Sequence, residues 1–194
     1  AADATSVYVV GSTSSSNLPA TAGAAVPSVV NPVNGDAFVT RFSRDLTSIL
    51  RSTYTRGGGS GSGEGLAALR DGDDLYIAGG ISSGLSQTTG AFQPNPVSTG
   101  FFTDGFVARF SADLGTLHRA SYLGGTASER VRAIAANATA IYLAGDADPS
   151  ANFPLPANAP DATFQQGEGF VFAISRDLGT RIGASLIGGM GGDS

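Results

Sequence analysis

The sequence predicts an all-β fold made of one four-stranded unit in three consecutive copies, with one strand missing from the first copy. Two observations lead to this prediction. Short runs rich in Phe, Tyr, Val and Ile alternate with stretches of Gly, Ser, Asn and Asp, which is typical of strands joined by turns. Three such runs also recur along the 194 residues in constant order and at near-constant spacing, which indicates a repeat architecture.

Each recurring run is predicted to form a strand. The first contains Tyr-x-x-Gly, the second an acidic residue followed by a small residue and Phe-Val, and the third precedes a pair of glycines. They lie at residues 8–11, 76–79 and 142–145, at 36–43, 104–111 and 168–175, and at 52–54, 120–123 and 184–187. In the second run, Phe38, Thr40 and Phe42 fall on one face of an extended chain, and Val39 and Arg41 fall on the other.

A fourth strand is expected between the third run of one unit and the Tyr run of the next. It covers residues 65–69 in one gap and 131–136 in the other. A short turn rich in Asp, Gly or Asn joins it to the Tyr strand, and hairpin turns require these residue types. The first unit begins at its Tyr strand, so we expect three, four and four strands, eleven in all.

Four antiparallel strands in a unit of about 66 residues form the plan of a β-propeller blade. The predicted fold is therefore all-β and of the β-propeller type, with three consecutive four-stranded blades, the first lacking one strand. The blades cover about residues 1–62, 63–127 and 128–194 of a single propeller region. Because propellers typically close with four to eight blades, we expect a partial ring or a ring assembled from several copies.

Long insertions separate the first and second runs of each unit, at about residues 12–35, 81–103 and 146–167. They are rich in Ser, Thr, Pro, Ala and Asn. We expect them to project from one rim of the disc, where loops on a rigid scaffold often provide recognition.

Composition excludes several classes of function. The chain carries 11 basic residues, all arginine, and 16 acidic ones, a net charge of −5 that disfavours nucleic-acid binding. The absence of cysteine excludes disulfides, thiolate metal ligands and a cysteine nucleophile. A single histidine, His118, excludes sites built from several imidazoles. The apolar runs are too short to predict a membrane-spanning helix.

No catalytic, cofactor-binding or metal-ligating residue is predicted. Two acidic groups offer oxygen atoms to calcium, but neither has the spacing of an EF-hand, and turn chemistry explains both. These groups are Asp71, Asp73 and Asp74, and Asp146, Asp148 and Asn152. His118 is expected at the surface, because no Gly-x-Ser-x-Gly motif accompanies it. Residues 57–63 are rich in glycine but lack the lysine of a phosphate-binding loop, so they are interpreted as a turn between blades.

Two further pairs of residues are singled out by their positions. Arg41 and Arg109 are equivalent in adjacent units, and each is expected to pair with an aspartate of its own or the next blade. The recurring Phe and Tyr residues are expected in the core. Phe101 and Phe102 do not recur, and one of them is expected to be exposed and to contact a partner.

The combined pattern resembles the SBBP repeats of bacterial β-propellers. The middle unit is the most similar, with Thr-Gly-Ala-Phe-Gln at residues 89–93 and Tyr-Leu-Gly-Gly at 122–125. The first unit departs by having Ala25 and Val26 in place of Phe-Gln, and the third has Ala173 in place of the arginine. The resemblance implies a propeller fold and an exported or envelope setting in a bacterium, and it implies no catalytic residues.

The sequence therefore predicts a non-catalytic, extracellular or cell-envelope propeller that serves as a protein-interaction or structural scaffold without a cofactor. Its expected partners are other proteins, or further copies or blades of the same propeller. Two alternatives stay open. One is a lectin-like propeller that binds carbohydrate, although the dissimilar insertions lack a repeated sugar site. The other is a fragment of a propeller enzyme whose active site lies in other blades.

Overall fold

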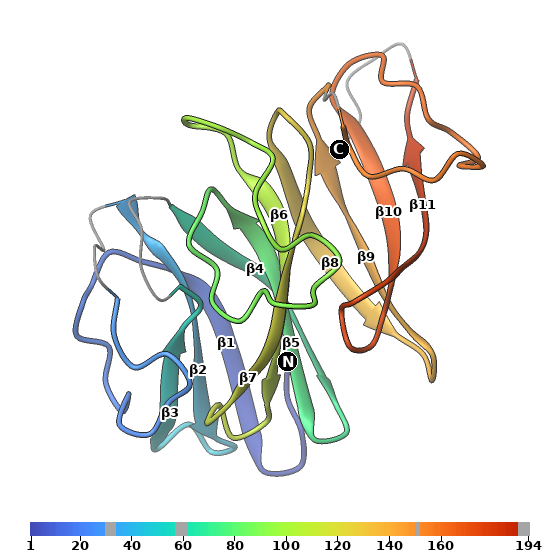
Figure 1. Cartoon of the computed structure of the whole chain (residues 1–194). Helices are drawn as coiled ribbons and strands as arrows, with labels where there is room; N and C mark the ends of the chain where they lie inside the picture. The colour runs from blue at the N-terminus through green and yellow to red at the C-terminus, as the bar shows by residue number, and fades with distance from the viewer. Residues whose placement is uncertain (30–33, 57–61, 150–151, 190–194) are drawn as a thin grey trace.

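The computed structural model describes residues 1–29, 34–56, 62–149 and 152–189. These residues contain eleven β-strands in three antiparallel sheets, as Figure 1 shows. The predicted all-β class and the grouping into three, four and four strands are confirmed. None of the described residues forms a helix able to cross a membrane.

Each sheet is formed by strands that are consecutive in the sequence. Sheet I has the order β1-β2-β3, sheet II the order β4-β5-β6-β7, and sheet III the order β11-β10-β9-β8. The strands are β1 (Ser6–Thr13), β2 (Asp36–Ser43), β3 (Ile49–Tyr54), β4 (Gly63–Asp71), β5 (Asp74–Ile81), β6 (Asp104–Ser111), β7 (Leu117–Leu123), β8 (Glu129–Ala136), β9 (Ala140–Ala147), β10 (Glu168–Ser175) and β11 (Arg181–Ile187).

The repeat in the sequence is also a repeat of strand pairing. In all three sheets the tyrosine of the Tyr-x-x-Gly run lies opposite the sixth residue of the acidic run. The pairs are Tyr8 with Arg41, Tyr76 with Arg109, and Tyr142 with Ala173. A register shift follows that sixth residue in each sheet, where the acidic run pairs with the next strand. Equivalent residues therefore occupy equivalent places on the three sheets.

The sheets are stacked face to face, with sheet II between the other two (Figure 1). Alternate residues of β5 pack into two different hydrophobic cores, one on each side of sheet II. Leu75 and Ile77 pack with sheet I, whereas Tyr76 and Ala78 pack with sheet III, and all four are fully buried. A strand buried on both faces explains the continuous apolar run in this part of the sequence. We call the surface that each sheet turns toward the following sheet its back face, and the opposite surface its front face. The back face of sheet III is the surface turned away from sheet II.

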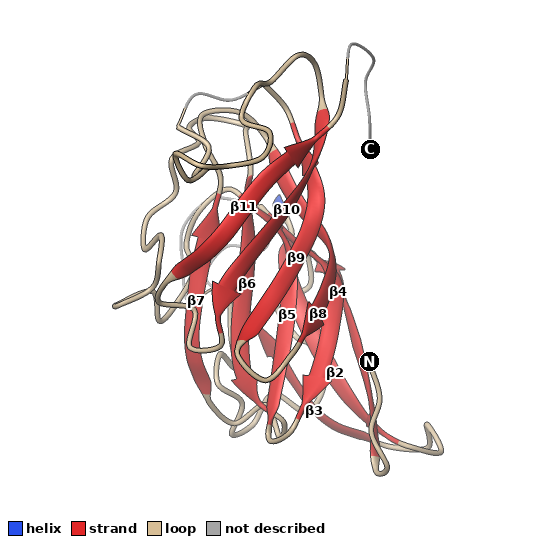
Figure 2. Ribbon diagram, turned by 90° about the vertical axis from the view of Figure 1, so that its right-hand side faces the viewer, coloured by secondary structure: helices blue, strands red, loops and turns tan. Residues whose placement is uncertain are grey.

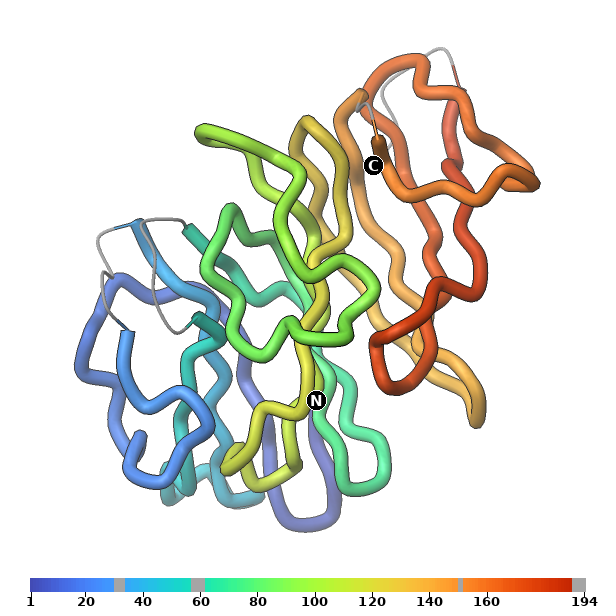
Figure 3. The backbone as a smooth tube through the Cα atoms, in the orientation of Figure 1, coloured from blue at the N-terminus to red at the C-terminus, as the bar shows by residue number. Residues whose placement is uncertain are grey.

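The long insertions lie along the outer edges of their own sheets and do not simply project from a rim (Figure 3). Backbone N–H groups of β3, β7 and β11 donate to carbonyl groups of the insertions. These bonds join Ser52 to Ala20, Tyr54 to Val26, Ala120 to Gln87, Tyr122 to Gln93 and Leu186 to Asp161. Pairing of this kind satisfies groups that an exposed edge strand would offer to other chains.

Side chains of the insertions also enter the cores. Val26 and Val29 are buried between sheets I and II, and Phe153 is buried with sheet III. The insertions are therefore part of the packed fold as well as surface loops.

In two of the units, a buried carboxylate at the start of a strand binds the end of the insertion that precedes it. Asp104 accepts hydrogen bonds from the backbone N–H groups of Val97 and Ser98, at 2.8 and 3.1 Å. Glu168 accepts one from Gln165 at 2.8 Å. Buried polar groups are tolerated when they are bonded in this way.

The equivalent carboxylate in sheet I, Asp36, has a cationic neighbour. Its Oδ1 lies 3.5 Å from Nε of Arg56, and both side chains are fully buried. Burial raises the pKa of Asp36 to about 6, although the positive charge of Arg56 acts in the opposite direction.

We expect the free energy of unfolding to fall as the pH rises from about 4 to about 6. In this range the folded protein keeps the proton of Asp36, whereas the unfolded chain releases it at its ordinary pKa. Asp36→Asn has no proton to release and should flatten this part of the profile. Urea unfolding followed by circular dichroism measures both slopes. Equal slopes in the parent and the variant would contradict this role of Asp36.

Candidate interaction surface

One set of polar contacts recurs between adjacent sheets, and it is seen first between sheets I and II. The hydroxyl group of Tyr8 on β1 donates to the carbonyl oxygen of Ala112, at 2.9 Å. Nη1 of Arg51 on β3 donates to the carbonyl oxygen of Asp113 at 2.9 Å and to its Oδ2 at 3.0 Å. Both acceptors lie in the turn between β6 and β7, at the front of sheet II.

The same contacts join sheets II and III. The hydroxyl group of Tyr76 donates to the carbonyl oxygen of Arg176 at 2.9 Å. Nη1 of Arg119 donates to the carbonyl oxygen of Asp177 at 2.8 Å and to its Oδ2 at 3.1 Å. Because the donors and acceptors occupy equivalent positions, one mode of sheet packing is used twice in the chain.

The accepting turn has the sequence Ser-x-Asp-Leu and the same structure in all three sheets. The serine hydroxyl donates to the aspartate Oδ1 at 2.5–2.6 Å, and the leucine N–H donates to the serine carbonyl at 2.8–2.9 Å. The serine bond lowers the pKa of each aspartate below its usual value. The three turns are residues 43–46, 111–114 and 175–178.

The leucine of each turn has a left-handed backbone, with φ of 60° at Leu46 and 62° at Leu114 and Leu178. This conformation costs an L-residue about 1–2 kcal/mol. Leu114 and Leu178 are fully buried, and burying a leucine side chain contributes about 1.5–3 kcal/mol. Their carbonyl groups also accept bonds from the insertion of the preceding sheet. Docking on that sheet therefore offsets the backbone strain at two of the three turns.

The front face of sheet I leaves its docking turn uncovered. Leu46 is 63% exposed, although its turn matches the two buried ones. Val9 is also exposed, whereas its equivalents Ile77 and Leu143 are buried. The chain thus presents a leucine turn of the type that packs against a neighbouring sheet, with no sheet against it in the described residues.

The back face of sheet III leaves the complementary surface uncovered. Figure 2 views the molecule from this side, with β9, β10 and β11 in front. Tyr142, Val171 and Ile182 are 44%, 40% and 57% exposed. They line a mainly apolar groove of about 610 Å³, together with Ala173 and Pro156 of the insertion. Contiguous exposed apolar surface of this kind marks interaction sites.

Three of the residues considered for metal binding or catalysis, Asp71, Asp74 and His118, lie in structural contacts. Asp71 pairs with Arg176 at 2.6 Å, and Asp74 pairs with Arg109 at 2.8 Å. Nε2 of His118 lies 3.8 Å from Asp74, at the partly exposed end of β7. Within the described ranges no three metal-binding side chains come together.

The residues of the second acidic group lie on different elements. Asp146 forms an ion pair with Arg132 on β8, and Asn152 lies in the insertion with a φ of 65°. Of the glycine-rich stretch, residues 57–61 lie outside the described residues, and Gly63 begins β4.

The expectation for the two equivalent arginines is met by one of them. Arg109 pairs with Asp74 of its own sheet, as predicted. Arg41 instead donates from Nε to the hydroxyl group of Ser6 at 2.8 Å, because serine stands at the position equivalent to Asp74. Neither arginine joins two sheets in these contacts. Arg51, Arg119 and Arg176 join sheets instead, and no role was predicted for them.

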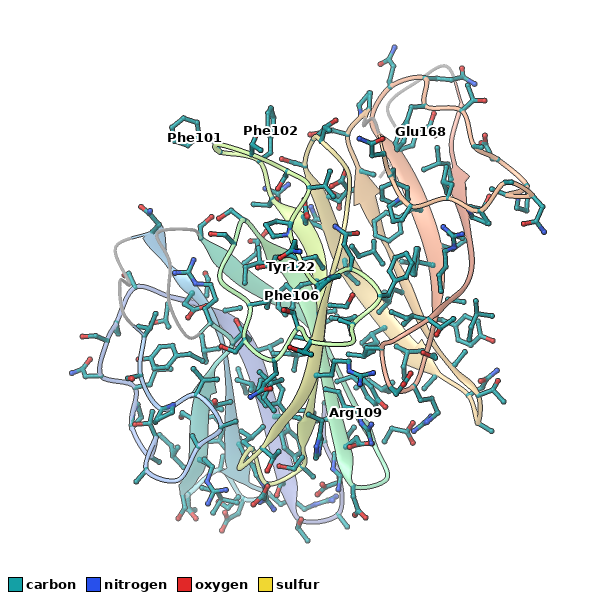
Figure 4. The ribbon with its side chains drawn as sticks, viewed as in Figure 1. Phe101, Phe102, Phe106, Arg109, Tyr122 and Glu168 are labelled. Atoms are coloured by element: carbon teal, nitrogen blue, oxygen red, sulfur yellow. The ribbon has the colours of Figure 1, made fainter. Side chains whose placement is uncertain are left out.

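The exposed phenylalanines lie where the sequence suggested. Phe101 is fully exposed and Phe102 is about half exposed, at the end of the insertion between β5 and β6. Figure 4 shows both at the tip of this loop, whereas the recurring Phe106 and Tyr122 lie in the interior. The expectation that recurring aromatic residues form the core is therefore met by Phe106 and Tyr122, but it is wrong for Tyr142, which is exposed.

Comparison with protein-family models finds no match to this chain, and comparison with curated proteins finds none. The similarity to SBBP repeats therefore rests on the residue pattern alone.

We expect the buried turn leucines to stabilise the chain far more than their exposed counterpart. Leu114→Ala and Leu178→Ala should each lower the free energy of unfolding by about 2–4 kcal/mol, because each leaves a cavity between two sheets. Leu46→Ala, the matched control, should change it by about 0.5 kcal/mol or less. Chemical unfolding in dilute solution compares the three variants. Similar losses at all three positions would contradict the docking role.

Proposed function

We propose that the chain is a three-bladed region of the β-propeller type that serves as a non-catalytic protein-interaction scaffold outside the cell or in the envelope of a bacterium. The propeller arrangement is supported by the contact that recurs between successive sheets. A single packing step repeated about an axis generates such a ring. β4 also lies against both β1 and β8, as expected for the innermost strands of adjacent blades.

The observation that carries the scaffold function is the open back face of sheet III. Tyr8 and Tyr76 are buried under a following sheet, whereas the equivalent Tyr142 is exposed beside an apolar groove. Val39 and Val107 are likewise fully buried, whereas the equivalent Val171 is exposed. The positions that form an interface between successive sheets are therefore exposed on sheet III among the described residues, and they suit a protein surface.

Two further points favour a non-catalytic role in the envelope. Several acidic and basic residues that could support chemistry are used in ion pairs between or within sheets, such as Asp71 with Arg176 and Asp74 with Arg109. The bacterial and extracellular setting follows from the resemblance to SBBP repeats.

A photo-crosslinking amino acid at position 171 tests this function in cells that produce the chain. We expect discrete adducts with protein, because Val171 lies in the exposed groove. The matched control places the same group at Asn95, which is exposed on the insertion between β5 and β6 and lies outside the groove. The masses of the adducts identify the class of partner. Equal labelling at both positions, or labelling at neither, would contradict an interaction role for this face.

A further inference from the structure

We propose that the back face of sheet III binds the front face of sheet I of a second copy of the chain, head to tail. Leu46 of the second copy would take the place that Leu114 and Leu178 take inside the chain. This proposal rests on the proposed function, since it names the partner of the same surface. It is argued from the continuity of this contact with the two interfaces already present between the sheets.

The front face of sheet I is already shaped for this contact. The bond from the Ser43 hydroxyl to Asp45 Oδ1 is 2.6 Å, equal to that in the docked turn of sheet II. Leu46 keeps the left-handed conformation while its side chain stays largely in water. A turn held in its bound shape loses little conformational entropy when it docks.

The back face of sheet III offers the matching donor and apolar surface. Tyr8 and Tyr76 each donate a hydroxyl hydrogen bond to a backbone carbonyl of the next sheet. Tyr142 occupies the third equivalent position. In the proposed contact its hydroxyl would reach the carbonyl group of Arg44 in the second copy, because Arg44 is equivalent to Ala112 and Arg176.

Two elements of the internal interfaces are missing from the contact between copies. Inside the chain, β4 and β8 lie against the preceding sheet, but the three-stranded sheet I has no equivalent strand in the described residues. Arg51 and Arg119 bind the aspartate of the following turn, but the equivalent residue on β11 is Gly183. Asp45 of a second copy would therefore find no guanidinium group there. We infer that the contact between copies is weaker than the contacts inside the chain.

Substitution of Gly183 offers a test in which the contact between copies should become stronger. A Cβ atom at Gly183 would meet no atom within 4 Å, and the backbone there is not left-handed. Gly183→Arg can therefore be accommodated and would supply the group that Arg119 supplies to Asp177. The outer edges of the sheets are paired with insertions, so the copies would associate through faces and not through those edges. A contact between two different surfaces can continue into rings or filaments.

Sedimentation velocity of the full chain over a range of concentrations tests the proposal. We expect concentration-dependent association in the parent that is about tenfold tighter in Gly183→Arg. Adding Asp45→Asn should remove most of this gain. Leu46→Gly keeps the left-handed turn and should weaken association about tenfold, because only the apolar contact is lost. Phe101→Ser removes an even more exposed apolar group elsewhere and should have no effect.

Two results would overturn the proposal. One is a parent and a Gly183→Arg variant that both stay monomeric at every concentration. The other is association that neither Leu46→Gly nor Gly183→Arg changes. If the chain is monomeric but residue 171 crosslinks to a different protein, the scaffold function stands and the second copy is excluded. Adducts of twice the chain mass at residue 171 would support both proposals.

Discussion

Burial of a strained leucine turn against the preceding sheet is the contact that recurs at both junctions of the three stacked sheets. The left-handed backbone of Leu114 and Leu178 is unfavourable by itself, and packing against a neighbour offsets that cost. The adjacent aspartate and carbonyl groups then accept hydrogen bonds from Arg51 or Arg119 and from Tyr8 or Tyr76. One short turn therefore joins apolar burial, charge pairing and backbone bonding at each interface.

The insertions cover the outer edges of the sheets, whereas the leucine turns pack against their faces. Turns and side chains hold the sheets together face to face, whereas the insertions pair with the outer strands β3, β7 and β11. Buried carboxylates such as Asp104 fix the end of the insertion to the start of the next strand. Apolar side chains remain exposed on the outward faces of sheets I and III, such as Leu46 and Tyr142.

Much of the fold was predictable from the sequence because its signal is local and repeated three times. Alternation around Phe38 and Phe106 determines which residues share a face, and the Asp-Gly turn between β4 and β5 defines a hairpin. The exposed position of Phe101 was also predictable, since this residue does not recur. The Ser-x-Asp-Leu turn recurs just as clearly, yet its role as a docking element was missed. No pattern within one unit shows which neighbour a turn will meet.

The sequence by itself determined the class, the approximate positions of the strands and the equivalence of residues among the three units, because strand patterning and turn chemistry act over a few neighbouring residues. Only the tertiary structure decided which arginines join the sheets, where the insertions lie and which faces stay open. These features depend on contacts between residues such as Arg119 and Asp177, or Tyr8 and Ala112, that are far apart in the chain. Their energies exist only once the sheets are stacked, so equivalent residues such as Leu46 and Leu178 can be exposed at one end and buried at the other.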